Sequence, residues 1–192
     1  MVFSATGNRK VGAWYGGMSE VMIASHYQRV YRMACIATRD SELSKDVTQE
    51  AFLTAFIKID TLKDKDKFGN WVCAIAVNLS KDMLRKRNRE KRMNDPLFDE
   101  HGNLHSGVTA ASTLVPEEWC ESREDLRAIL KCLGELDIEE RQVIILKFFQ
   151  GMSYVEISHA LKIKESTLRM RALRAKEKIS NKVKYHFGKE DD

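Results

Sequence analysis

Near the carboxyl end of this 192-residue chain, two helix-forming segments are separated by a very short turn. The first segment is 153–161, the turn is 162–164 and the second segment is 165–184. This spacing is typical of a helix-turn-helix, whose second helix lies in the major groove of DNA. A solvated basic face is the alternative, but a capping box at Ser153 and Glu156 favours DNA binding. The side chains that could donate to bases and phosphates are Ser166, Thr167, Arg169, Arg171 and Arg174.

A second basic segment, 81–92, holds seven basic and two acidic residues. It follows a polar loop, 60–67, and the aromatic residues Phe68 and Trp71. Cations interleaved with aromatic rings suit single-stranded nucleic acid. Two structural alternatives remain open: the basic run is equally consistent with a solvated helix end, and the helical spacing of Trp71 favours a core position. The lysines of the loop are Lys63, Lys65 and Lys67.

Motifs that would indicate an enzyme are missing from the sequence. There is no glycine-rich phosphate loop, no H-E-x-x-H and no nucleophile elbow, so we expect no catalytic residue and no cofactor. The four cysteines include no C-x-x-C pair, and we therefore predict no metal site and buried thiols in a reducing cytoplasm. No apolar run reaches the roughly 18 residues needed to span a membrane, so a cytoplasmic protein without membrane insertion is expected.

The composition predicts the elements that must position these residues. Helix formers dominate, only 2 prolines occur, and 43% of residues are hydrophobic against 31% charged, which indicates an all-α globular protein. Apolar stripes predict helices over 19–38 and 42–59 and another beginning at Phe68. We expect these helices to form one domain, 19–92, behind a flexible extension, 1–18.

The rest of the chain predicts a second small domain on a tether. Residues 93–116 contain proline and glycines without a hydrophobic period, which is typical of a flexible linker. Helical patterns resume near residue 117, and four helices are expected in a domain over 117–187. The predicted fold class is therefore all-α, with two small helical domains joined by a flexible linker.

Charge is strongly segregated along the chain, although the net charge is only +4. Segment 81–92 carries +5 and segment 162–184 carries +7, whereas 94–142 holds twelve acidic and four basic residues, a net −8. Two basic blocks thus flank an acidic one, as expected if two separate surfaces meet nucleic acid.

One stretch of the first domain resembles a known family. Residues 46–52 read D-V-T-Q-E-A-F, similar to the D-x-x-Q-E-x-F of bacterial extracytoplasmic-function (ECF) sigma factors. The resemblance implies that this helix binds the β′ clamp helices of core RNA polymerase. From the residues alone, the polar ridge could equally be a solvated face. The implied contacts are Asp46, Gln49, Glu50 and Phe52.

A second match lies at the aromatic helix. Residues 68–79 are similar to the family's F-x-x-W-L-x-x-I-A-x-N, with Val72 in place of leucine. In the family, the preceding loop captures an unpaired base of the −10 promoter element, and this helix contacts the opened strand. The residues implied here are Lys63, Lys65, Lys67, Asn78, Arg85 and Lys86.

The third match is the helix-turn-helix. Residues 151–157 resemble G-x-S-Y-x-E-I, and 166–175 resemble the family's recognition helix G-T-V-K-S-R-L-H-R-A. Lys162 and Ser166 replace glycines and Leu173 replaces a histidine, so a less relaxed turn and an altered base contact are expected. The resemblance implies that Ser166, Thr167, Arg169, Arg171 and Arg174 read the −35 element.

The sequence therefore predicts a sigma factor that binds core RNA polymerase at the β′ clamp helices and the β flap. It would recognise −10 and −35 promoter DNA, help open the duplex and be controlled by an anti-sigma factor. The extended linker reaches at most about 80 Å, enough for elements separated by about 70 Å. The alternatives are a helix-turn-helix repressor that acts without polymerase, with 19–92 for oligomerisation, and a polymerase-binding protein that does not read DNA.

Overall fold

The computed structural model describes residues 18–94 and 123–187, and all regular structure within these ranges is helical. The predicted all-α class is confirmed. Residues 1–17 of the expected extension and residues 95–116 of the expected linker lie outside the described residues. Residue 18 and residues 93–94, which were expected in these flexible segments, are helical instead. The first part comprises α2 (Met18–Thr38), α3 (Ser41–Ile57), the 3-10 turns η1 (Ile59–Thr61) and η2 (Lys65–Lys67), and α4 (Phe68–Asn94). The second comprises α5 (Arg123–Glu135), α6 (Ile138–Ile144), the π-helical η5 (Ile145–Phe149), α7 (Tyr154–Leu161) and α8 (Glu165–Phe187).

Side chains that the sequence places before helices do cap them. The Asp40 carboxylate accepts from the Leu43 amide at the start of α3. Ser153 and Glu156 form the predicted reciprocal capping box at α7. Each cap satisfies amides that have no partner within the helix and contributes about 1 kcal/mol. Among the described helices, none is long and apolar enough to cross a bilayer.

Two helices end at left-handed residues that are not glycine. Arg39 follows α2 with φ of 60°, and Lys162 follows α7 with φ of 56°. A side chain in this region costs about 1–2 kcal/mol relative to the right-handed form. Gly151, with φ of 65°, ends the α6–η5 segment without that cost. The sequence-based expectation of a less relaxed turn at Lys162 is therefore confirmed.

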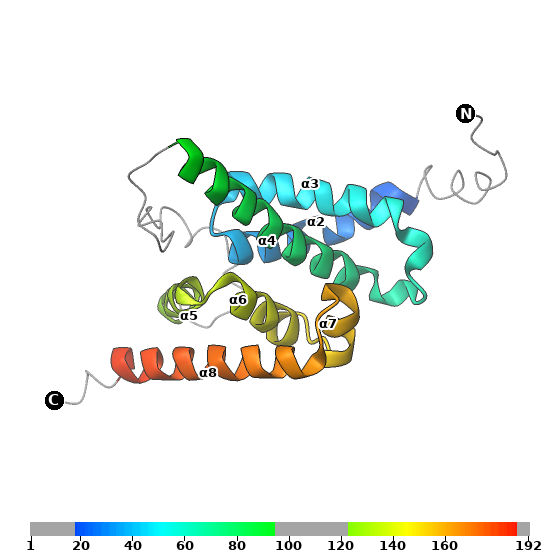
Figure 1. Cartoon of the computed structure of the whole chain (residues 1–192). Coiled ribbons are helices and arrows are strands. Elements are labelled where there is room, and N and C mark those ends of the chain that lie inside the picture. Colours follow the sequence, from blue (N-terminus) through cyan, green and yellow to red (C-terminus); the bar gives the residue numbers. More distant parts are fainter. Residues whose placement is uncertain (1–17, 95–122, 188–192) are drawn as a thin grey trace.

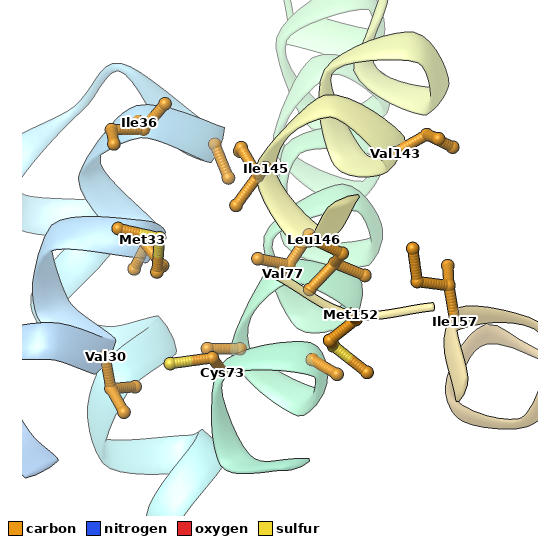
Figure 2. Close-up of a cluster of buried hydrophobic side chains, with 14 of the residues drawn as sticks. Val30, Met33, Ile36, Cys73, Val77, Val143, Ile145, Leu146, Met152 and Ile157 are labelled. Atoms are coloured by element: carbon orange, nitrogen blue, oxygen red, sulfur yellow. The ribbon is translucent and has the colours of Figure 1, made fainter. Parts of the chain in front are cut away.

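The helices form two layers with one shared core. In Figure 1, α2, α3 and α4 lie on one side and α5 to α8 on the other. Between them, apolar side chains from α2 and α4 meet side chains from η5 and from the start of α7 (Figure 2). The members at this junction include Met33, Val77, Ile145, Leu146 and Met152, which are all buried. The two predicted domains thus share a hydrophobic core. The sequence-based prediction of two domains on a flexible linker did not include this packing.

Two buried polar residues of α6 also join the layers. Arg141 donates to the carbonyls of Leu133, Gly134 and Leu136 in its own layer and of Ala37 in the other, over 2.8–3.1 Å. Burial lowers the pKa of Arg141 to about 10, which leaves it cationic at neutral pH. Gln142 donates across the interface to the carbonyl of Val77, at 2.9 Å. We call this packed form of the two layers the closed arrangement.

Candidate polymerase- and DNA-binding surfaces

The polar ridge of α3 is exposed as its spacing predicts. Asp46, Gln49 and Glu50 all lie on the solvent side of the helix, opposite the buried stripe formed by Val47, Ala51 and Ala55. Carboxylates at 46 and 50, one turn apart, give the ridge two negative charges. The ridge is therefore available to a partner with basic groups.

Phe52 does not share this exposure, and its predicted direct contact with a partner needs correction. Its side chain is 5% exposed and stacks on Tyr27, with ring centroids 6.3 Å apart. Its apolar ring is buried because it falls beside the core stripe. Sequence reasoning instead missed Leu53 and Ile57, which are 57% and 80% exposed. The signal was present in their spacing, because Leu53 follows Gln49 by one helical turn and Ile57 follows Leu53 by another.

The loop and helix proposed for opened DNA carry their cations on the surface. Lys63, Lys65 and Lys67 are exposed on the segment between α3 and α4, and Arg85 and Lys86 are exposed on α4. Asn78 is half-buried on the same helix. Trp71 is half-buried and contacts the ring of Phe68, with centroids 6.2 Å apart, which supports the core interpretation of Trp71.

Two of these cations are paired with carboxylates of the second layer. Lys67 Nζ lies 2.8 Å from Glu156 Oε1 at the start of α7, and Arg85 pairs with Glu139 of α6. The Lys67 ammonium, with the Ser153 amide and hydroxyl, lowers the pKa of Glu156 to about 2. In the closed arrangement, both cations are therefore already paired with protein anions.

The recognition helix α8 presents most of its predicted contacts to solvent. Ser166, Thr167, Arg169 and Arg174 are exposed, while Leu168, Ala172 and Ala175 face the core. Arg169 lies over the Tyr154 ring, 4.7 Å from its centroid, and within 3.4 Å of Glu165. The Tyr154 ring and the Glu165 carboxylate thus hold the Arg169 guanidinium near the start of α8, on the exposed side of the helix-turn-helix.

Arg171 is less exposed than the sequence pattern predicts. It is half-buried, and its Nη1 atom has no hydrogen-bond partner among the described residues. Residue 171 lies one turn from both Leu168 and Ala175, at the border of the buried stripe rather than opposite it. The buried stripe of α8 is wider than the apolar residues of the sequence indicate, and it partly covers the Arg171 side chain.

Comparison with known proteins identifies both halves of the chain. Residues 22–90 match the family Sigma-70 region 2, and residues 126–179 match the family Sigma-70, region 4. The ECF RNA polymerase sigma-E factor of Escherichia coli (strain K12) is 33% identical over 138 residues, which are 72% of each chain. The chain belongs to the ECF RNA polymerase sigma factors. The ECF RNA polymerase sigma factor SigW of Bacillus subtilis (strain 168) is 28% identical over 158 residues, 82% of each chain.

Solved structures agree with this sigma-factor fold. The sigma factor RpoE in complex with the anti-sigma factor NepR from Bartonella quintana has a TM-score of 0.66 at 22% identity, covering 86% of this chain and 96% of that one. CnrH, solved with the cytosolic domain of CnrY, has a TM-score of 0.58 at 21% identity, covering 92% and 94%. Because sigma families match both parts of the chain, the repressor alternative is not favoured.

Proposed function

We propose that this sigma factor binds core RNA polymerase through the α3 ridge and the region-4 part, and reads two promoter elements through separate surfaces. The loop before α4, with Asn78, Arg85 and Lys86, would hold the opened −10 strand. Ser166, Thr167, Arg169 and Arg174 would contact the −35 duplex, with Arg171 joining them if its half-buried side chain swings out. An anti-sigma factor would control the protein, which would act with polymerase in the cytoplasm.

The observation that carries this proposal is the placement of two cationic surfaces on the two matched regions. Lys67 and Arg85 lie on the region-2 part, and Arg169 and Arg174 lie on the region-4 part. Capturing unpaired bases at the first surface would shift the duplex toward the open form, because the factor binds one of the two states better. Duplex contacts at the second would fix the register.

The closed arrangement must open for both elements to be bound together. Lys67 contacts the start of α7, and α7 has eight residues, so its far end lies only about 12 Å away. The recognition helix begins four residues later, at Glu165. Two turns of DNA separate sites by about 70 Å. We infer that the two layers separate on polymerase, releasing Lys67 and Arg85 from Glu156 and Glu139.

Reconstituted transcription tests the proposal. Core polymerase with and without this chain would be given a library of genomic DNA fragments, and the start sites of the transcripts would be mapped. We expect specific starts that require the chain, and fewer of them with the double substitution Arg169→Ala and Arg174→Ala. If no fragment in the library supports initiation that depends on this chain, the proposal is overturned. Specific duplex binding without polymerase would support the repressor instead.

A further inference from the structure

Two large apolar side chains lie on the exposed face of the recognition helix. Met170 and Leu173 are 50% and 51% exposed, one helical turn apart on α8. Successive residues of an α-helix are about 100° apart, which places Met170 about 190° and Leu173 about 130° from the middle of the buried stripe. Neither contributes to the core, so both are presented to whatever α8 binds.

The residues around Met170 and Leu173 indicate what kind of partner this face of α8 binds. Arg169 and Arg174 flank this pair, one on each side, and both are exposed. Glu177, one turn further along the same face, is also exposed and marks the end of the strip, since phosphates repel a carboxylate. An apolar strip bordered by guanidiniums complements a groove whose walls are phosphates and whose floor includes apolar groups. The thymine C5-methyl is the apolar group of the major groove.

We propose that Met170 and Leu173 read thymine methyl groups in the −35 element, so that the sequence preference of this sigma factor includes thymines at the positions they face. This rests on the proposed function, because it assumes that α8 enters the major groove. The proposal gives two apolar residues a part in base selectivity, whereas the −35 contacts predicted from the sequence are all hydrogen-bond donors. The arginines then supply anchoring and guanine contacts, while the apolar pair distinguishes thymine from cytosine.

The test removes the methyl groups without altering base pairing. A promoter recovered from the library transcription would be synthesised with deoxyuridine in place of each −35 thymine in turn. Initiation by the holoenzyme would then be compared with the unmodified template. Each contacted methyl should contribute about fourfold, the factor expected for burying one apolar carbon.

Protein variants identify which side chain reads which methyl. Leu173→Ala should abolish the penalty for deoxyuridine at one position while leaving the others, and Met170→Ala should do the same at a second position. Val155→Ala is the matched control, because Val155 is also 50% exposed but lies on α7. It should retain the full wild-type ratio of thymine to deoxyuridine templates. Circular dichroism should show unchanged helix content in all three variants.

The outcomes separate the two proposals. Normal initiation with no deoxyuridine penalty, or with a penalty that survives both alanine substitutions, overturns the inference and leaves the sigma function intact. In that case the apolar pair would serve a protein partner. Loss of all initiation with wild-type protein on every template overturns the proposed function itself, and the methyl-reading inference with it.

Discussion

Substitutions of Gln142 should shift the equilibrium between the closed arrangement and an open form, in either direction. The Gln142 side chain is 1% exposed, its Nε2 donates to the Val77 carbonyl across the interface, and its Oε1 is buried without a partner among the described residues. Val77 lies inside α4, where its carbonyl already has a helical donor. The two informative substitutions are Gln142→Leu, which removes both polar atoms, and Gln142→Glu, which makes the buried group anionic.

The magnitudes follow from these contacts. The interlayer hydrogen bond contributes about 1 kcal/mol, whereas the unsatisfied oxygen costs about 1–3 kcal/mol when buried. Gln142→Leu removes both effects and should favour closure by about 1 kcal/mol, roughly a fivefold change in the ratio of closed to open molecules. Gln142→Glu buries a carboxylate that lacks a cationic partner and should favour opening by several kcal/mol.

Small-angle X-ray scattering of the full chain would measure the effect as a radius of gyration. We expect a larger radius for Gln142→Glu, and a radius equal to or smaller than wild type for Gln142→Leu. The same two substitutions at Gln28, an exposed residue of α2, are the matched controls and should change nothing. Chain-dependent transcription should decrease with Gln142→Leu, because opening then costs more free energy. Equal scattering and equal transcription for both Gln142 variants would refute the reasoning.

Three further predictions concern stability. Lys162→Gly should raise the free energy of unfolding in urea by about 1 kcal/mol, because it relieves a left-handed residue; an unchanged midpoint would contradict this. Arg141→Met should lower the free energy of unfolding by at least about 3 kcal/mol, because four carbonyls lose a charged donor. Arg141→Lys should recover only part of this loss. The pKa of Glu156 is lowered from 4.5 to about 2, so its contribution is present above pH 4.5 and lost as pH falls toward 2. Wild type should therefore lose more thermal stability over that acid range than Glu156→Gln, and equal losses would contradict the role of the Lys67 pair.

The local structure could be predicted because its causes are local. Helix starts at Ser41 and Tyr154 follow from capping side chains directly before them, and the end at Gly151 follows from a residue that tolerates positive φ. The exposure of Asp46 and Glu50 follows from helical periodicity. The errors at Phe52 and Arg171 have one origin: both lie at the border of a stripe, where burial depends on which neighbour packs there rather than on spacing.

The closed arrangement could not be predicted, because each residue that forms the interface between the layers also has another explanation in the sequence. Val77 belongs to the same apolar run that packs α4 within the first layer, so no pattern shows that it also meets the second. Gln142 reads as an ordinary polar residue, although it is buried and bonded across the interface. Charge segregation is visible in the sequence, where it predicts contacts with outside partners. In the structure, Arg85 of the first basic block pairs with Glu139 of the acidic block. Opposite charges far apart in a chain thus indicate an internal contact as readily as an external one, and the geometry decides between them.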